Sequence, residues 1–303
     1  MSRIHEALKK AASERNAQLP EGSTSQLVEL AGDIIGEREV SAQVGVAIRN
    51  GSSGTGKAPS PQHEELLRRC QRTEWNIDPK FSVFANERRD RSGAEKFRTL
   101  RSRLYQIAAT RPLKRIVVTS SVPEEGKTFI ASNLAQSIIR QEQRRVLLID
   151  GDLRASRLHL TLGAAIKPGL ADYLRGEADE FEIVQTGKQP NLSLIAGGTE
   201  VQNPSELLQS NAMRTLLDRL TPLFDWVILD SPPAIAVHDA SMLADICDGV
   251  LMVVRAGKTD FEVAQKAARE FGEERLLGVV LNRAEKSDGY PYSYAYIAEK
   301  EES

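Results

Sequence analysis

The 303-residue chain is poor in cysteine, in aromatic residues and in long apolar runs. Its two cysteines, Cys70 and Cys247, lie far apart and outside any C-x-x-C pattern, which excludes a disulfide scaffold and a zinc finger. The longest strongly apolar run covers only Val250 to Val254, whereas a membrane-spanning helix needs about 20 residues. The first residues also lack the apolar segment of a secretory signal, so we expect a cytoplasmic protein.

Neither sign of charge dominates. The 40 basic and 42 acidic residues give a net charge of −2, so we expect no nucleic acid as a partner. Apolar residues make up 41% of the chain and charged residues 27%, which provides enough apolar material for a sizeable core and excludes a fully disordered protein.

Composition divides the chain into four parts. Residues 1–16 carry an apolar stripe at helical spacing and predict a helix that either docks on a partner or caps the main domain. Residues 17–80 are expected to be a flexible linker, because residues 51–61 are rich in Gly, Ser and Pro. Residues 81–286 are expected to form the globular domain, and residues 287–303 a tyrosine-rich tail.

The domain alternates short apolar runs with helical stretches such as Phe129 to Gln141. Continuous apolar runs are typical of strands buried on both faces of a sheet. Alternation of strand and helix predicts an α/β fold with a mostly parallel sheet sandwiched by helices, in which ligands bind at the carboxyl ends of the strands. The predicted strands are 116–118, 146–149, 192–195, 226–229, 250–254 and 277–281.

A phosphate-binding loop is predicted directly after the first of these strands, where Gly126-Lys-Thr128 opens a helix. Backbone N–H groups at such a helix start cradle phosphates, the ammonium of Lys127 reaches the terminal phosphates, and the Thr128 hydroxyl ligates Mg²⁺. This makes the fold P-loop NTPase-like. Ser121 stands where the motif G-x-x-x-x-G-K-[ST] has its first glycine, which leaves an ordinary helix start with an exposed lysine as the alternative.

Two further strand ends carry carboxylates. Asp150 and Asp152 lie two residues apart after the strand 146–149, so their side chains point the same way, as a Mg²⁺ ligand and a base would require. The alternative for Asp152 is a cap on the following helix. Asp230 ends the strand 226–229 in the manner of a Walker B element, which holds the metal.

The order and spacing of these three motifs resemble the Walker A, A′ and B motifs of bacterial tyrosine kinases, the capsular and exopolysaccharide autokinase family. The resemblance covers Phe81 to Tyr296 and includes Asn203-Pro-Ser-Glu-Leu-Leu208. The first eight residues, Met1-Ser-Arg-Ile-His-Glu-Ala-Leu, resemble the exosortase-linked subgroup. One departure is Glu124, where the family usually has glycine.

The resemblance implies a role for each site residue. Asp150 orients or deprotonates the acceptor tyrosine, and it forms the catalytic set with Lys127 and Asp152. Mg²⁺ is held by Thr128, Asp152 and Asp230. ATP is contacted by Glu125, Gly126, Lys127, Thr128 and Phe129, with Asn282 at the adenine.

The acceptor is expected in the tail, where four of the six tyrosines lie between Gly289 and Tyr296. The resemblance implies autophosphorylation of Tyr290, Tyr292, Tyr294 and Tyr296, and a short tail favours transfer into a neighbouring subunit. An aromatic tail that packs on its own domain is the alternative.

Assembly is suggested by Glu95, Arg98 and Arg101, which share one stripe of a predicted helix. They resemble the element that joins family subunits into rings, and the alternative is a solvated charged face.

The expected function is therefore an ATP-dependent protein-tyrosine autokinase that regulates exopolysaccharide or capsule biosynthesis and export. The resemblance implies recruitment to the inner face of the membrane by a polysaccharide co-polymerase, and a cognate tyrosine phosphatase. Two alternatives are a MinD/ParA-like positioning ATPase, a group with a lysine at the place of Val122, and a weakly active nucleotide-binding scaffold.

Overall fold

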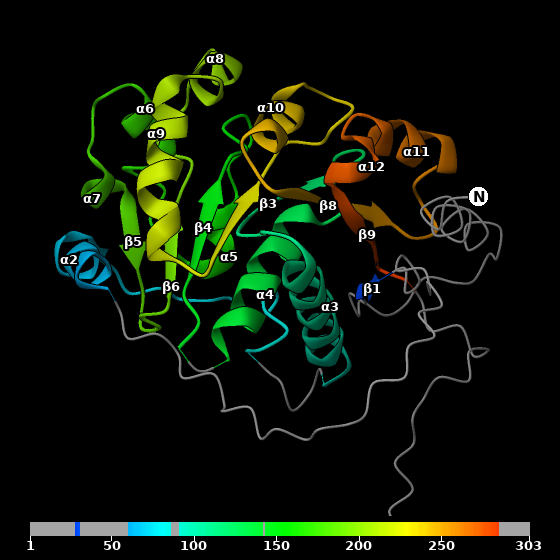
Figure 1. The fold of residues 1–303 in the computed structure, drawn as a ribbon, viewed down its shortest axis with the longest axis horizontal. Coiled ribbons are helices and arrows are strands. Elements are labelled where there is room, and N and C mark those ends of the chain that lie inside the picture. The colour runs from blue at the N-terminus through cyan, green and yellow to red at the C-terminus, as the bar shows by residue number, and fades with distance from the viewer. Residues whose placement is uncertain (1–27, 31–59, 86–90, 142, 285–303) are drawn as a thin grey trace, which may run out of the picture.

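Nine strands form one sheet in the order β1-β9-β8-β3-β7-β4-β6-β5-β2 (Figure 1). The computed structural model describes residues 28–30, 60–85, 91–141 and 143–284. The strands are β1 (Val28–Leu30), β2 (Gln71–Arg72), β3 (Arg115–Ser120), β4 (Val146–Asp150), β5 (Val184–Thr186), β6 (Leu192–Ile195), β7 (Trp226–Asp230), β8 (Gly249–Arg255) and β9 (Leu276–Asn282). Six of the eight pairings between neighbours are parallel; β1 with β9 and β5 with β6 are antiparallel.

Helices cover both faces of the sheet (Figure 1). The longer ones are α2 (Pro61–Arg69), α3 (Arg91–Thr110), α4 (Lys127–Ile139), α9 (Asn211–Leu220), α10 (Asp239–Asp245) and α11 (Phe261–Arg269). The shorter ones are α5 (Leu158–Leu162), α6 (Leu170–Leu174), α7 (Glu180–Ile183), α8 (Pro204–Leu208), the 3-10 turn η1 (Thr221–Leu223) and α12 (Gly272–Arg275).

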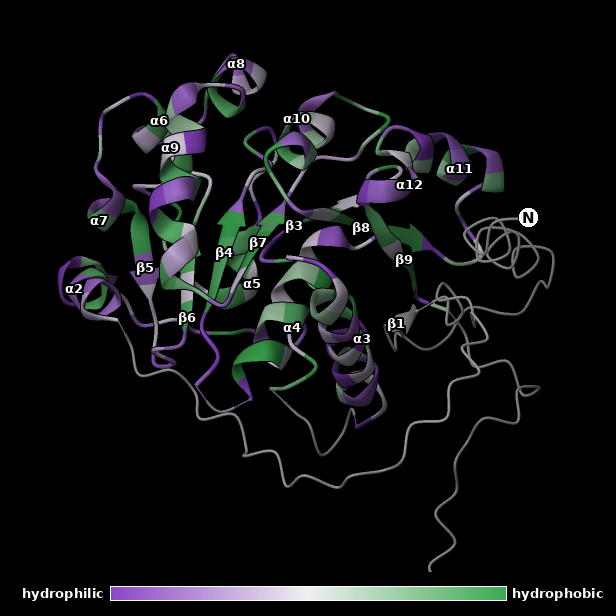
Figure 2. Cartoon of the chain, viewed as in Figure 1, coloured by the Kyte–Doolittle hydropathy of each residue, from purple (hydrophilic) through white to green (hydrophobic). Residues whose placement is uncertain are grey.

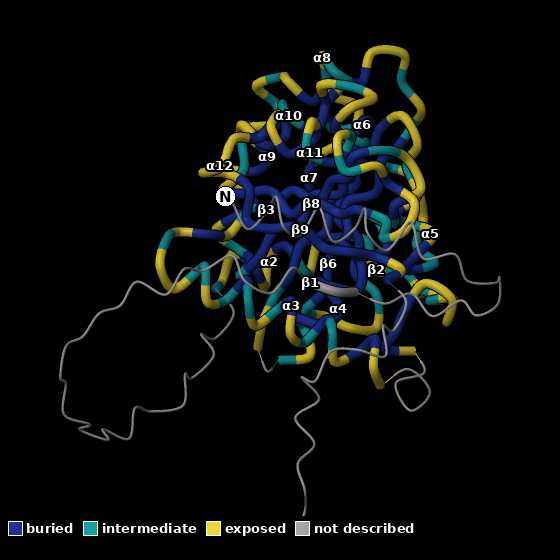
Figure 3. Tube along the Cα trace, turned by 90° about the vertical axis from the view of Figure 1, so that its right-hand side faces the viewer, coloured by how far each residue is buried: buried dark blue, intermediate teal, exposed yellow. Residues whose placement is uncertain are grey.

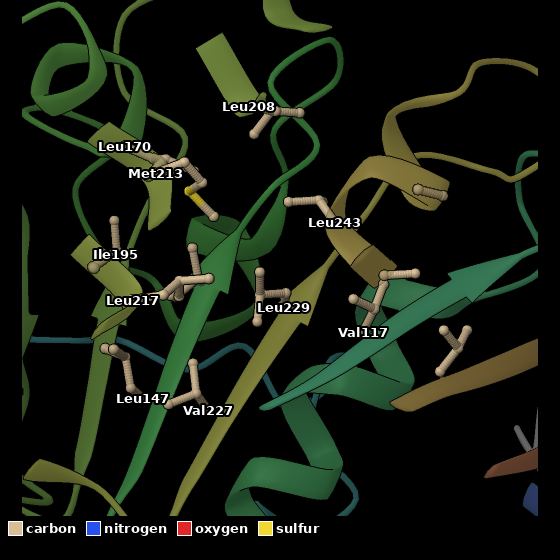
Figure 4. Packing of buried hydrophobic residues seen from close by; sticks show 14 of the residues in the cluster. Val117, Leu147, Leu170, Ile195, Leu208, Met213, Leu217, Val227, Leu229 and Leu243 are labelled. Atoms are coloured by element: carbon tan, nitrogen blue, oxygen red, sulfur yellow. The ribbon is translucent and has the colours of Figure 1, made fainter. Parts of the chain in front are cut away.

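The central strands are apolar on both faces because each face has its own core. Ile116 and Val118 of β3 pack in one cluster with α3 and α4, whereas Val117 packs in the other cluster with α9 and α10. Figure 4 shows part of this second cluster, with Val117, Leu147 and Leu229 on the strands and Met213 and Leu243 on the helices. Figure 2 shows that the central strands are hydrophobic, and Figure 3 shows that they are buried.

The predicted α/β sandwich is confirmed, and all six predicted strands are present as β3, β4, β6, β7, β8 and β9. The predicted helix 129–141 is α4, which begins two residues earlier and ends two residues earlier. The strands β1, β2 and β5 were not predicted; each has only two or three residues.

The predicted linker 17–80 is wrong for its last part. Ser60 caps α2 by accepting a hydrogen bond from the backbone N–H of His63, and Leu66 of α2 is only 2% exposed in the core. The following strand β2 pairs with β5, and β1 pairs with β9, so residues 28–30 and 60–80 belong to the domain rather than to a linker. Ser60 and Pro61, which start α2, are residue types that also favour a linker, so composition does not separate the two.

The predicted N-terminal helix (1–16) and the tyrosine-rich tail (287–303) lie outside the described residues. Within the described part of the chain, none of the helices combines the length and the apolar character needed to cross a bilayer.

Candidate active site

The three predicted motifs lie at adjacent strand ends because β7 is paired with both β3 and β4. Asp230 at the end of β7 is opposite Val118 on one side and Asp150 on the other. The phosphate loop, the two aspartates after β4 and Asp230 therefore meet at one edge of the sheet.

The start of α4 is built to receive an anion. Gly126, at φ +97°, turns the chain into the helix, and the first helical hydrogen bond runs from Ile130 N–H to the Gly126 carbonyl. The N–H groups of Lys127, Thr128 and Phe129 consequently have no partner within the helix. Such N–H groups, together with the helix dipole, attract a phosphate.

Lys127 holds the strand ends together electrostatically. Its Nζ lies 2.8 Å from Asp152 Oδ2 and 3.8 Å from Asp230 Oδ1. Burial by itself would lower the pKa of Lys127, but Asp230 and Asp152 outweigh burial and raise the pKa. Lys127 is therefore a largely buried cation at this edge, and the alternative of an exposed lysine at an ordinary helix start is wrong.

Thr128 and Asp230 offer oxygen ligands side by side. The Thr128 hydroxyl donates to Asp230 Oδ2 at 2.6 Å, whereas Asp230 Oδ1 is buried and has no hydrogen-bond partner. A buried carboxylate oxygen without a donor is costly for a protein and is satisfied by a cation. This oxygen has the Lys127 ammonium 3.8 Å away but no hydrogen-bond donor, and its place beside a hydroxyl fits Mg²⁺.

No group of three His, Cys, Asp or Glu side chains in the described part of the chain is arranged to hold a metal by itself. Mg²⁺ commonly takes one or two carboxylates and completes its shell with water and substrate phosphates. The pair Asp152 and Asp230 with Thr128 meets that requirement. Asp152 also accepts from the backbone N–H of Ala155 at 3.1 Å, which closes a turn and does not cap α5.

Asp150 is fully buried, and burial together with repulsion from Asp230 raises its pKa to about 7. Its Oδ2 accepts from the Ser156 hydroxyl (2.7 Å) and from the Leu158 N–H (3.0 Å). Its Oδ1 accepts only a longer bond from the Asp152 N–H, at 3.2 Å. A carboxylate with a pKa near neutrality and one lightly engaged oxygen is suited to accept a proton.

The side chains of three residues predicted to contact ATP are instead engaged within the protein. The Glu125 carboxylate is buried and bonded within the protein, and Phe129 packs in the core 6.0 Å from the Phe97 ring. Asn282, predicted at the adenine, is 1% exposed, and its Nδ2 donates to the Glu125 carbonyl at 2.7 Å. Glu125 and Phe129 can serve a ligand only through their backbone, and the Asn282 amide supports the loop.

Comparison with known proteins identifies the family. A family model described as AAA domain matches residues 114–266. The tyrosine-protein kinase YwqD of Bacillus subtilis is 34% identical over 203 residues, which are 66% of this chain and 85% of YwqD. The chain belongs to the bacterial tyrosine-protein kinase family. The tyrosine-protein kinase Etk of Escherichia coli K12 is 32% identical over 231 residues, 71% of this chain but only 32% of Etk.

Solved kinase structures have the same fold. The kinase domain of the Escherichia coli tyrosine kinase ETK superposes with a TM-score of 0.60 and 31% identity, covering 66% of this chain and 81% of that domain. The chimerical protein CapA2B2 superposes with a TM-score of 0.64 and 27% identity, covering 74% and 100%. The predicted family and P-loop NTPase-like fold are confirmed; the exosortase-linked subgroup stays a prediction.

The departure of this kinase from its family at Glu124 has a visible consequence. Glu124 adopts φ +66°, a left-handed conformation that glycine takes at no cost. Its side chain is exposed. Ser121, the other departure, is buried, and its Oγ has no hydrogen-bond partner.

The predicted assembly stripe is divided in two by the structure. Arg98 and Glu95 form an exposed ion pair at 2.8 Å. Arg101 instead donates to the Ser137 carbonyl near the end of α4 at 2.5 Å and is half-buried. Glu95 is exposed and Arg98 is half-buried, whereas Arg101 also joins α3 to α4.

Sequence reasoning missed a second polar cluster beside the site. Arg154 donates from Nε to the buried Asp239 at 2.8 Å and from Nη2 to the Ser205 hydroxyl at 2.8 Å, and Ser205 donates to Asp239 at 2.6 Å. The cluster joins the turn after Asp152 to α8 and α10. Ser205 lies in a segment that the sequence analysis names and Arg154 follows Asp152 by two residues, but nothing in either segment indicates their common partner.

Proposed function

We propose that the chain is an ATP- and Mg²⁺-dependent protein-tyrosine autokinase that phosphorylates the tail of another copy. The acceptors would be Tyr290, Tyr292, Tyr294 and Tyr296. The observation that carries the proposal is the convergence of a buried ammonium, a hydroxyl and three carboxylates at the start of α4, namely Lys127, Thr128, Asp150, Asp152 and Asp230. Membership of the tyrosine-protein kinase family supports it.

Each group has a defined task in this proposal. Lys127 and the free N–H groups at the start of α4 bind the phosphates, while Thr128, Asp152 and Asp230 hold Mg²⁺. Bound MgATP supplies the γ-phosphoryl group. Asp150 accepts the phenolic proton at Oδ1 as the tyrosine oxygen bonds to phosphorus and the bond to the ADP oxygen breaks.

The cellular setting is proposed from the same resemblance. Regulation of exopolysaccharide or capsule biosynthesis would need the cytoplasmic kinase at the inner face of the membrane, brought there by a co-polymerase protein. Copies would assemble through Glu95, Arg98 and Arg101 into a ring that presents one tail to the next site, and a tyrosine phosphatase would reset the tail.

Mass spectrometry of the C-terminal peptide after incubation with MgATP tests the activity. Wild type and the exposed-lysine control Lys188→Ala should carry phosphotyrosine, whereas Lys127→Ala and Asp150→Ala should carry none. Transfer between copies is tested by mixing two variants. One has an intact site, but its four tail tyrosines are replaced by phenylalanine; the other is Lys127→Ala with an intact tail. We expect the first to phosphorylate the tail of the second.

Other outcomes separate the remaining functions. ATP hydrolysis without phosphotyrosine would favour a positioning ATPase. Nucleotide binding with neither hydrolysis nor phosphotyrosine would favour a binding scaffold. Labelling retained in both Lys127→Ala and Asp150→Ala would contradict the assigned roles.

A further inference from the structure

The Glu125 carboxylate ties the phosphate loop to a part of the protein that lies outside the three nucleotide motifs. Its Oε2 accepts from the Val122 N–H within the loop at 2.9 Å. Its Oε1 accepts from the Arg255 N–H at the end of β8 at 3.1 Å and from the Thr259 hydroxyl just before α11. One side chain therefore connects the loop to the β8–α11 connection.

The hydrogen bonds of Glu125 are buried, so the loss of one of them should be costly. Glu125 is 1% exposed and Thr259 is 5% exposed, so water cannot replace a lost partner readily. Burial raises the pKa of Glu125, and the bonds from Thr259, Val122 and Arg255 oppose that effect. A buried carboxylate that loses one of its donors pays a desolvation penalty that an exposed one avoids.

A second hydrogen bond holds the backbone of Glu125, and it comes from strand β9, which is the neighbour of β8. The Asn282 amide at the end of β9 donates to the Glu125 carbonyl at 2.7 Å. A Cβ placed on Gly126 would lie 2.1 Å from Asn282 Nδ2, which shows how closely the amide approaches the loop. Glu125 is thus fixed by its side chain and by its backbone, two residues before Lys127.

We propose that Glu125 is a positioning residue that presets the phosphate loop for nucleotide, and that Thr259 is the partner through which it acts. This inference rests on the proposed function, since it assumes that the loop binds ATP. A loop already held in its binding conformation loses little entropy when phosphate binds, whereas a loosened loop must be ordered at that moment. Loss of the anchor should therefore weaken nucleotide binding without removing any group that touches the phosphates.

Thr259→Val and Thr259→Ser test the anchor with matched shapes. Valine removes the hydroxyl that donates to Glu125, and serine keeps it. We expect Thr259→Val to raise the Kd for MgADP, measured by calorimetry, about ten-fold, with Thr259→Ser near wild type. The KM for ATP should rise by a similar factor, while kcat at saturating ATP should change by less than about two-fold.

Glu125→Gln tests the other end of the contact. The amide keeps the size of the side chain, but its NH₂ group must face either the Val122 or the Arg255 N–H, so one hydrogen bond is lost. We expect an increase in Kd at least as large as that of Thr259→Val. The effects of the two changes on Kd should not multiply in the double variant, because both act on the hydrogen bonds of one carboxylate. Glu262→Gln, an exposed carboxylate in the first turn of α11, is the control and should bind like wild type.

Each outcome decides one question. A wild-type protein that binds no nucleotide would overturn the proposed function and this inference together. A wild type that binds nucleotide while Thr259→Val and Thr259→Ser share its Kd would overturn the inference alone. Thermal melts without nucleotide would reveal whether Glu125→Gln folds. If it does not, the comparison of Thr259→Val with Thr259→Ser still tests the inference.

Discussion

Lys127 and Asp152 lie 25 residues apart in sequence, yet their Nζ and Oδ2 atoms are 2.8 Å apart in the structure. This ion pair joins the phosphate loop to the turn after β4, and Asp230 extends it to β7. One ammonium faces three carboxylates, since Asp150 lies opposite Asp230. The excess negative charge suits a divalent cation but lowers the stability of the fold.

Asp230→Asn should stabilise the protein while removing the proposed Mg²⁺ site. Burial raises the pKa of Asp230, which means that the folded state disfavours its charge. Asparagine can still accept from the Thr128 hydroxyl and puts an NH₂ group where Oδ1 has no donor. We expect the free energy of unfolding to rise by about 1 kcal/mol, or about 2–4 °C in Tm.

Thermal melts and nucleotide titrations with and without Mg²⁺ measure both effects of Asp230→Asn. The Mg²⁺-dependent part of nucleotide affinity should fall at least about ten-fold. Glu74→Gln, at an exposed carboxylate, is the control and should change neither quantity. A lower Tm in Asp230→Asn would contradict the electrostatic argument.

Glu124→Gly should stabilise the phosphate loop. Glycine removes the cost of a β-carbon at φ +66° but adds entropy to the unfolded chain, for a net gain of about 0.5–1 kcal/mol. Glu124→Ala is the matched control, since it removes the same carboxylate and keeps the β-carbon. Chemical denaturation of both variants measures the difference, and equal stability of the two would refute the backbone explanation.

Arg101→Gln and Arg98→Gln should separate stability from assembly. Arg101 donates to the Ser137 carbonyl, so its loss should lower the free energy of unfolding by about 1–2 kcal/mol. Arg98 pairs with Glu95 at the surface, and its loss should leave Tm nearly unchanged. Light scattering after size exclusion measures assembly, which we expect both changes to weaken. An Arg98→Gln variant that assembles like wild type would remove Arg98 from the proposed interface.

Acid should destabilise the protein through His63. This ring packs edge-on against Phe224, and burial, with a smaller contribution from Arg145, lowers its pKa to about 4, while Asp225 opposes the shift. The unfolded chain binds a proton near pH 6.5 and the folded protein only near pH 4, so stability is full above pH 6.5 and is lost as pH falls toward 4. Between pH 6.5 and 5 the loss is about 2 kcal/mol.

His63→Phe removes this proton-binding difference. Denaturation curves at pH 7 and pH 5 should show a smaller acid effect in His63→Phe than in wild type. His238→Gln, at an exposed histidine, should keep the wild-type acid effect. The same pH dependence in all three proteins would show that His63 does not titrate as the structure implies.

Much of the site could be predicted because its signals are local. Gly126-Lys-Thr128 directly precedes and begins a helix, and the apolar strands β4 and β7 each end in an aspartate. Burial of short strands and of α2 could not be predicted in the same way. A two-residue strand such as β2 has no periodicity, and only its pairing with β5 makes it a strand.

The amino-acid sequence by itself determined the α/β alternation, the phosphate loop and the identity of the acidic residues, because runs of neighbouring residues encode them. The tertiary structure alone decided that β7 lies between β3 and β4, which brings Asp230 to Asp150 and Lys127. It also gave Glu125 a partner 134 residues away, in Thr259, and turned Asn282 toward the loop. Such contacts depend on which strands pair across the sheet, and strand order is a property of the whole packed core.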